Sequence, residues 1–376
     1  MATIAPRDPI APPHPPTGRE EALATLHSVR ERTLALVDHL SEDELSRVLS
    51  PIMSPLVWDL AHIAAYEDLW LAHRHGGLEL LRPDLAELYD AFETPRSVRG
   101  EIELLGPEQA RAYLRDVRTR SAEALTAQGV GDGTIYELVV RHELQHTETM
   151  RQTMALAGLL PEGEPNLEPL ADEDAWIDVP AGPFEMGADT DGFAYDNERP
   201  RHTVELPAFQ IARDPVSNAS WVSFSERGGY ERREWWSEQG WTWKLQEGIV
   251  PHAGIADEHP HAPVCHVSWF EAEAFAAASG VRLPTEAKWE KAAACGAISA
   301  VGQVWEWTSS RFDGYPGFVA HPYREYSEVF FGGDYRVLRG GSWATSPRVK
   351  TRTFRNWDHP VRRQIFAGVR LARDVA

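Results

Sequence analysis

The chain has 376 residues, of which 43% are apolar, so it is long enough for two domains that each bury a core. Its formal net charge of −20 disfavours nucleic acids and anionic membrane surfaces as partners. No apolar run approaches membrane-spanning length, and two cysteines, Cys265 and Cys295, cannot build a disulfide framework, so we expect a protein of the reducing cytoplasm.

The first part of the chain is predicted to be helical. Residues 1–18 form a proline-rich leader, which lacks the apolar core of a signal peptide and which we expect to be disordered. Residues 19–159 follow with amphipathic periodicity. The helices are expected at 19–39, 55–73, 107–127 and 134–158, with a long connection at 76–106. This spacing predicts an antiparallel four-helix bundle.

The second part has a different texture. Residues 160–174 are acidic and punctuated by prolines, which predicts a linker between domains. Residues 175–376 combine short apolar runs with frequent Gly and Pro, and helices are expected only near 215–227 and 269–297. This pattern indicates a loop-rich α+β domain. The 14 tryptophans of the chain suggest either aromatic-walled pockets or a domain that needs large core side chains.

The stretch HELQHTE at 142–148 is the main candidate for chemistry. On a helix His142 and His146 return to within about 40° of each other, so they share a face, which we expect to be the inward one. The spelling His-Glu-x-x-His is also the zinc-peptidase signature, in which Glu143 is the general base. We expect Glu143 to lie off the inward face, and Glu148 is roughly 200° from His146, so it cannot join the same metal. The alternative is a pair of ordinary hydrogen-bonded histidines.

A metal site needs a third ligand. His62, in SPLVWDLAHIAAYEDLW, lies on the second predicted helix, on the side away from its apolar stripe, where it can face the pair. Three neutral imidazoles leave coordination positions open, which suits a non-haem iron that holds substrate and O₂ together. No recognisable third-ligand motif of a zinc peptidase follows downstream. The residues therefore favour three-histidine iron.

Several longer motifs carry a family resemblance. They are SPLVWDLAHI, HELQHTETM, VPAGPFEMGA, PVCHVSWFEAEAFAAASGVRLPTEAKWEKAAA, GQVWEWTSS, DYRVLRGGSWA and FRNWDHPVRRQIFAGVRLARD. Together they resemble the hercynine oxygenases, the sulfoxide synthases of ergothioneine biosynthesis (EgtB-type). In that family a DinB-like helical bundle is fused to a formylglycine-generating-enzyme/sulfatase-modifying domain of C-type-lectin-like fold. The resemblance covers nearly everything after residue 20.

The resemblance implies an activity and a cofactor. His62, His142 and His146 match the iron ligands, so Fe(II) is the expected cofactor and O₂ a co-substrate. The family joins the imidazole C2 of hercynine (trimethyl-histidine) to a thiol sulfur and leaves a sulfoxide. The expected partners are the small molecules hercynine and γ-glutamylcysteine, and we expect a monomer. Whether the second domain holds a structural Ca²⁺ stays open.

The resemblance also assigns substrate-contacting residues. Tyr323 matches the tyrosine that acts as the acid. Residues that match the hercynine pocket are Gln145, Tyr326, Asn356 and Trp357. Residues that match the pocket for the glutamyl part of γ-glutamylcysteine are Arg96, Arg99, Asp358 and Arg362. Guanidinium groups suit carboxylate recognition, and a carboxylate can take an ammonium, so these charges favour γ-glutamylcysteine over cysteine as the sulfur donor.

One departure from the family pattern concerns the connection after Ala294. In the family a long segment separates the WEKAAA helix from the following WEWT strand, whereas here EKAAACGAISAVGQVWEWT joins them almost directly. Residues 339–373 contain no cysteine, which disfavours formylglycine-generating chemistry, and packing is the expected role of Cys265 and Cys295. Three alternatives remain open: the same chemistry with cysteine or a selenium donor, a zinc metallopeptidase, and a non-catalytic binding module.

Overall fold

The fold is taken from a computed structural model that describes residue 16 and residues 18–171, 175–252 and 254–375. The predicted leader therefore lies outside the described residues apart from Pro16 and Gly18, and so do residues 172–174 of the predicted linker. The chain forms two compact units, and the boundary between them falls between Glu164 and Pro165.

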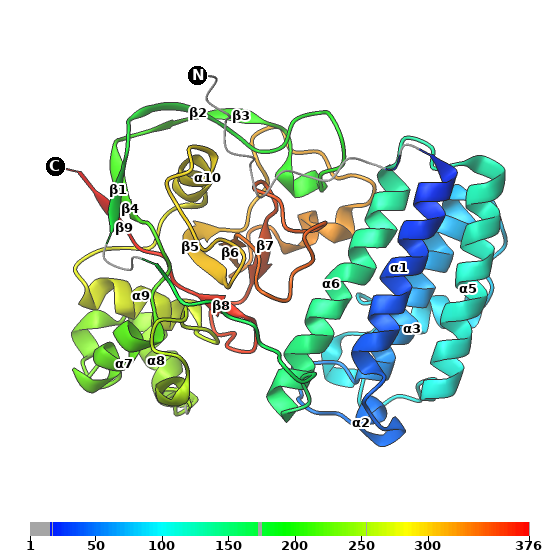
Figure 1. Cartoon of the computed structure of the whole chain (residues 1–376), viewed down its shortest axis with the longest axis horizontal. Helices are drawn as coiled ribbons and strands as arrows, with labels where there is room; N and C mark the ends of the chain where they lie inside the picture. The colour runs from blue at the N-terminus through cyan, green and yellow to red at the C-terminus, as the bar shows by residue number, and fades with distance from the viewer. Residues whose placement is uncertain (1–15, 17, 172–174, 253, 376) are drawn as a thin grey trace. The chain divides into compact units, whose positions relative to one another are not determined.

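Long helices build the first unit. Figure 1 shows α1, α3, α5 and α6 side by side, and each occupies a range in which the sequence predicts a helix. Their bounds are Arg19–Val37 for α1, Leu56–Glu67 for α3, Pro107–Gln128 for α5 and Thr134–Ala157 for α6. Pro107 stands at the first position of α5, where its missing N–H costs nothing, and Gly158 ends α6 in the left-handed conformation, φ 68°.

The segments between these helices are more structured than the sequence suggested. The short helices α2 (Glu42–Ser46) and α4 (Pro83–Leu88) and the 3₁₀ turn η2 (Arg96–Val98) occupy them. The helix predicted at 55–73 continues past α3 as a π-helical stretch, η1 (Asp68–His75). Helix α3 is almost entirely buried and packs against α5 and α6, so it forms the centre of this unit's core.

The second unit combines small sheets with short helices. One sheet has the order β1-β4-β9, another pairs β2 with β3, and a third has the order β7-β6-β5-β8. The strands are β1 Trp176–Val179, β2 Gly182–Met186, β3 His202–Leu206, β4 Phe209–Ala212, β5 Trp305–Arg311, β6 Arg336–Arg339, β7 Asn356–Asp358, β8 Ala367–Gly368 and β9 Ala372–Asp374. The helices are α7 Asn218–Glu226, α8 Glu238–Gln246, α9 Trp269–Ala278 and α10 Glu286–Ala294.

Two helix predictions in this unit need correction. The run 269–297 is two helices, because Gly280, at φ 68°, and Pro284 interrupt it between α9 and α10. Helix α8 was not predicted, since Gly240 lowers the intrinsic helix propensity of its segment. Tertiary packing favours a glycine there, since a Cβ at position 240 would lie 3.0 Å from the ring of Phe270.

Large aromatic and ion-paired side chains fill the core of the second unit. Trp221, Trp289, Trp305 and Trp307 are fully buried, so core filling rather than pocket walls accounts for these tryptophans. The buried carboxylate of Glu306 joins a strand, a helix and the C-terminal segment, since it accepts hydrogen bonds from the Trp289 indole and from the Arg370 guanidinium. Such pairing satisfies polar groups that a loop-rich core would otherwise leave unmatched.

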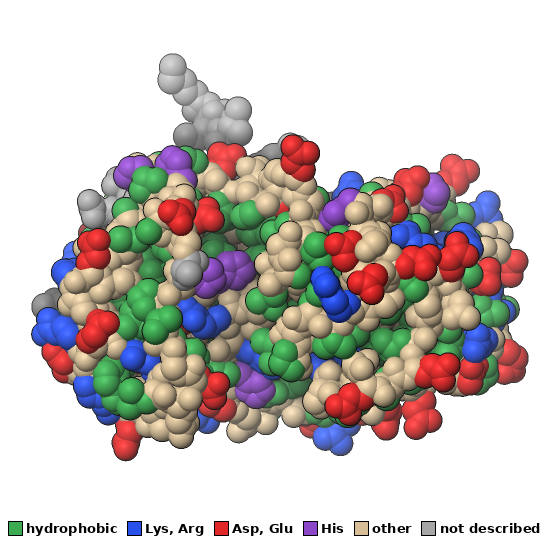
Figure 2. All heavy atoms as spheres, turned by 90° about the horizontal axis from the view of Figure 1, so that it is seen from below, with side chains coloured by type: hydrophobic (Ala, Val, Ile, Leu, Met, Phe, Trp, Pro, Cys, Tyr) green, Lys and Arg blue, Asp and Glu red, His purple; other side chains and the backbone are tan. Residues whose placement is uncertain are grey.

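Surface features are consistent with the composition. Acidic side chains are spread over the face shown in Figure 2. Within the described part of the chain, no helix is both long enough and apolar enough to cross a bilayer. Cys295 is exposed, so the packing role expected for it is wrong, whereas Cys265 is half-buried.

Candidate metal centre

Three imidazoles from two helices converge in the first unit. His62 comes from α3, and His142 and His146 come from successive turns of α6. One ring nitrogen from each histidine lies within 4.8 Å of the others, and the Nε2 atoms of His62 and His142 are 3.0 Å apart. The structure therefore brings together the three ligands that the sequence predicted.

Neighbouring groups fix the orientation of each ring. The Nδ1 of His62 lies 2.5 Å from the backbone carbonyl oxygen of Tyr89, and the Nδ1 of His146 lies 2.9 Å from Oδ1 of Asp59. The ring of His142 stacks on Tyr66, with 3.6 Å between centroids. Because the Nδ1 atoms of His62 and His146 are occupied in this way, their Nε2 atoms are free to serve as ligands.

The electrostatics of the site also suit a metal ion. Burial lowers the pKa of His62 and of His142 well below the usual value, and repulsion from His146 lowers both further. These two imidazoles are therefore neutral and carry the lone pair that a metal needs. Three imidazole nitrogens at this separation fit a divalent transition metal.

Glu143 follows His142 in the sequence, but its side chain belongs to a separate buried ion network. It is 1% exposed, and its carboxylate accepts hydrogen bonds from Arg30 Nε at 2.8 Å and from Arg118 Nη2 at 2.8 Å. Both guanidinium groups also bind Glu67, which completes a buried network of four charges joining α1, α3, α5 and α6. The expectation that Glu143 lies off the inward face is wrong, because its carboxylate is buried inside the bundle, where ion pairing makes its burial possible.

The face of α6 that carries the histidines is correspondingly less enclosed than expected. His142 and His146 are only partly buried, as is Gln145 between them in sequence. This openness separates the candidate metal centre from the closed ion network around Glu143.

The two arginines after α4 differ sharply in environment. Arg96, on η2, is exposed. Arg99 is 4% exposed, and its guanidinium donates to the carbonyls of Thr94 and Ala91 and to the hydroxyl of Ser54. It also lies 3.4 Å above the ring of Trp58, which in turn stacks on His62 with 4.5 Å between centroids. Burial lowers the pKa of Arg99 to about 10, so it remains charged at neutral pH.

In the second unit, the predicted aromatic residues form one group. Tyr323 precedes the 3₁₀ turn η6 (Arg324–Tyr326), and its ring lies 6.2 Å from that of Tyr326. Tyr326 meets Trp357 edge to face at 6.0 Å. One face of Trp357 is covered by Phe312, whose ring stacks on it at 4.0 Å. Residues separated by some thirty positions are thus gathered by the fold.

The polar residues of the same region lie on and after β7. Asn356 and Asp358 share one face of that strand, whereas Trp357 points to the other, since strand side chains alternate. Asp358 Oδ1 accepts from the backbone N–H of His359 and lies 3.6 Å from Nε of Arg362. Asp358 and Arg362 are therefore paired with each other in this structure.

Sequence reasoning missed two residues at the metal centre. Asp59 and Tyr66 both lie on α3 or at its end and touch the histidines of α6 directly. For Asp59 a signal existed: a carboxylate three residues before His62 in an otherwise apolar helix has to find a buried partner. Tyr66 gave no comparable signal, because a tyrosine in an amphipathic helix is ordinary.

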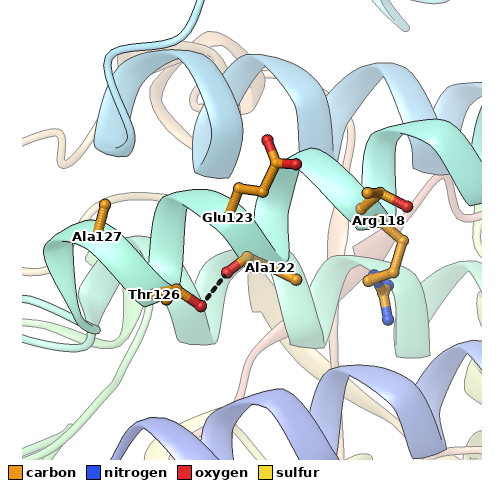
Figure 3. Close-up of a pocket in the computed structure, with 6 residues that line it drawn as sticks. Arg118, Ala122, Glu123, Thr126 and Ala127 are labelled. Atoms are coloured by element: carbon orange, nitrogen blue, oxygen red, sulfur yellow. Dashed lines mark hydrogen bonds between the residues drawn. The ribbon is translucent and has the colours of Figure 1, made fainter.

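A hollow over α5 carries no comparable chemistry. Figure 3 shows it lined along that one helix by Arg118, Ala122, Glu123, Thr126 and Ala127, with Thr119 as a further lining residue. The hydroxyl of Thr126 donates a hydrogen bond to the carbonyl oxygen of Ala122 at 2.7 Å, and the guanidinium of Arg118 binds Glu143 in the buried ion network. We therefore place the functional site at the histidines.

Known proteins match the chain in both units. The DinB superfamily matches residues 25–150, and the family described as sulfatase-modifying factor enzyme 1-like domain matches residues 162–300 and 294–375. A hercynine oxygenase of Mycolicibacterium thermoresistibile is 41% identical, covering 97% of this chain and 96% of its own length. The chain belongs to the hercynine oxygenase family. As a member of that family it is an enzyme of the oxygenase class, with a DinB-like helical domain followed by a sulfatase-modifying domain of mixed helix and sheet.

Further hercynine oxygenase relatives agree. The hercynine oxygenase of Mycolicibacterium smegmatis is 41% identical, covering 95% of this chain and 99% of its own length. Ergothioneine biosynthesis protein 1 of Schizosaccharomyces pombe is 23% identical, covering 94% of this chain and 56% of its own length. The alignment with the M. thermoresistibile hercynine oxygenase spans 442 positions, more than the 376 residues of this chain, so that relative has residues that this chain lacks.

The short connection after α10 is where the two matches to the sulfatase-modifying family meet. Those matches end and begin within 294–300. Here the chain passes from Ala294 to Trp305 through turns at Gly296 and Gly302. Ser299 anchors this connection by two hydrogen bonds: its hydroxyl donates to Asp214, and its backbone carbonyl accepts from Arg370. The shortened connection is thus a packed part of the second unit.

Proposed function

We propose that this enzyme binds Fe(II) and joins the imidazole C2 of hercynine to the sulfur of γ-glutamylcysteine. The C2–H and S–H bonds are lost, a C–S bond forms, and one oxygen atom of O₂ becomes the sulfoxide while the other leaves as water. The thiol–imidazole pair gives up four electrons, which O₂ takes up. The observation that carries the proposal is the convergence of His62, His142 and His146 within 4.8 Å.

The metal would be held by the Nε2 atoms of His62 and His146 and by a ring nitrogen of His142. A ferrous ion supplies open positions at which substrates and O₂ can meet. The protein's own contribution is orientation: Tyr89 and Asp59 fix the rings, and the neutral state of His62 and His142 keeps their lone pairs available. Holding hercynine, the thiol and O₂ at one site would replace the meeting of three separate molecules in solution with a reaction inside one bound complex.

We assign the substrate contacts as follows. Arg96 binds a carboxylate of the glutamyl group directly, because it is exposed. Arg99, whose guanidinium is held by three internal acceptors, fixes the loop that carries Arg96. We also assign Asp358 and Arg362 to γ-glutamylcysteine, for whose ammonium and carboxylate they would exchange their mutual contact.

The remaining assignments concern hercynine and the proton. Gln145, Tyr326, Asn356 and Trp357 bind hercynine, and an aromatic ring such as that of Trp357 can attract its quaternary ammonium. Tyr323 donates the proton that the reduction of O₂ requires. In this proposal residues 19–159 form a four-helix iron domain, 160–174 a linker, and 175–376 a C-type-lectin-like domain.

The test uses the purified full chain loaded with Fe(II) under nitrogen. O₂ uptake and product mass are measured with hercynine and, in parallel, γ-glutamylcysteine, cysteine and selenocysteine. We expect the sulfoxide conjugate of γ-glutamylcysteine as the main product. Much faster turnover of cysteine or of the selenium donor would transfer the proposal to that substrate, and hercynine binding without O₂ uptake would contradict catalysis.

Nothing in the geometry favours the metallopeptidase alternative. A general base must reach a water on the metal, but the Glu143 carboxylate is fully engaged by Arg30 and Arg118 inside the bundle. Stoichiometric zinc together with caseinolytic activity would reverse this conclusion.

A further inference from the structure

Asp59 is a buried carboxylate in the helical unit. It lies in the apolar helix α3, three residues before His62, and is 1% exposed. Its Oδ1 lies 2.9 Å from Nδ1 of His146, while its Oδ2 has no hydrogen-bond partner among the described residues. A buried carboxylate is costly unless its partners offset the lost hydration. The contact with His146 therefore calls for a functional explanation.

The three histidines are held by chemically different groups. A backbone carbonyl holds His62, the ring of Tyr66 holds His142, and a carboxylate holds His146. Of these three contacts, only the carboxylate brings a negative charge. A carboxylate on the far nitrogen of a metal-bound imidazole fixes its tautomer and ring angle and makes the imidazole a stronger donor.

A buried cation, Arg99, lies near that carboxylate. Arg99 is buried above the ring of Trp58, the residue next to Asp59 in the chain. Burial lowers the pKa of Arg99 to about 10, and attraction to Asp59 works against that lowering, so the guanidinium keeps its charge at neutral pH. A buried cation near a buried carboxylate offsets part of the cost of both.

We propose that Asp59 is a positioning residue that aims Nε2 of His146 at the metal and increases the donor strength of that ligand. Helix α3 thus supplies one ligand, His62, and through Asp59 also controls a ligand carried by α6. The inference rests on the proposed function in that it needs a metal at the three histidines. It goes further by giving Asp59 an effect on the metal's affinity and redox potential.

Two variants separate geometry from charge. Asp59→Asn keeps an oxygen that can accept the His146 N–H but removes the charge, whereas Asp59→Ala removes both. Fe(II) affinity is measured anaerobically by competition with a chelator, and the Fe(III)/Fe(II) potential by spectroelectrochemistry. We expect Asp59→Ala to weaken Fe(II) binding by about 10- to 100-fold, as loss of such outer contacts does elsewhere. Asp59→Asn should weaken Fe(II) binding less than Asp59→Ala does. It should also raise the Fe(III)/Fe(II) potential, because a negative charge stabilises Fe(III) and this variant removes that charge.

Controls keep the outcomes distinct. Asp116→Asn, at an exposed position of α5, should match wild type in both measurements. His62→Ala should abolish tight binding, and if it does not, the three-histidine proposal itself fails. If wild type binds Fe(II) normally while Asp59→Asn shows unchanged affinity and potential, only the role of Asp59 is refuted. Should Asp59→Ala not fold, as judged by far-UV circular dichroism, Asp59→Asn decides the question.

Discussion

The substitution Glu143→Gln distinguishes a buried structural charge from a catalytic base. The network around Glu143 holds two arginines and two glutamates, so it is neutral overall. The substitution keeps an acceptor oxygen for Arg30 but leaves the two guanidinium groups facing Glu67 alone. Breaking a buried ion pair in this way lowers the free energy of unfolding by about 3–5 kcal/mol. We expect a loss near the lower end of that range, because the amide keeps one acceptor oxygen.

This cost translates into a thermal shift. For a unit of about 150 residues, 1 kcal/mol lowers the Tm by about 2–4 °C, so a loss of about 3 kcal/mol lowers the Tm by about 6–12 °C. The assay is differential scanning calorimetry of the full chain, with attention to the transition of the helical unit. Glu123→Gln, at an exposed position of α5, is the matched control and should leave the Tm within about 1 °C, as surface changes usually do.

The refuting results are specific. A Tm for Glu143→Gln within about 2 °C of wild type would show that the network does not hold the bundle together. An intact fold combined with the loss of a metal-dependent peptidase activity would restore Glu143 as a general base. In contrast, we expect Fe(II) affinity per folded molecule to change little, because Glu143 contacts none of the three histidines in the interactions described above.

The other predictions concern catalysis, specificity and pH. Tyr323→Phe should lower the sulfoxide yield by about 10²- to 10⁴-fold while O₂ uptake continues through thiol oxidation, as product mass and an oxygen electrode would show; an unchanged yield removes Tyr323 from the mechanism. Arg96→Gln should raise the KM for γ-glutamylcysteine by about 10- to 100-fold, because the substitution removes one charged hydrogen bond to the glutamyl group. The KM for cysteine should stay unaltered, and equal effects on both thiols would contradict the assignment. Burial, with repulsion from His252, lowers the pKa of His266 to about 4, so between pH 6.5 and 4 the unfolded chain holds a proton that the folded chain lacks. Stability is therefore full above pH 6.5 and should fall by about 2 kcal/mol between pH 7 and 5 in urea unfolding. His266→Asn should remove that slope, since Asn tolerates the φ of 63° at this position, and a slope that persists would mean that another group titrates.

Sequence periodicity was sufficient where a helix has one apolar face and clear ends. The range of α1 followed from its density of helix-forming residues, and those of α3, α5 and α6 from apolar periodicity and from Pro107 and Gly158. The same method was less successful in the second unit, where elements are short: it located α7 but joined α9 to α10 and missed α8. There Gly240 lies within a helix because it packs against Phe270, a contact between residues thirty positions apart that local propensity cannot express.

The sequence alone was enough to place His142 and His146 on one face of a helix, because they are four residues apart, and to identify the family, because the motifs run along nearly the whole chain. The polar residues around that pair could be identified only from the folded structure. Asp59 next to His146, Glu143 between Arg30 and Arg118, and Arg99 above Trp58 are all buried charges. Sequence patterns assign such side chains to the surface, since a charge is stable inside a protein only when a partner from another helix offsets its lost hydration.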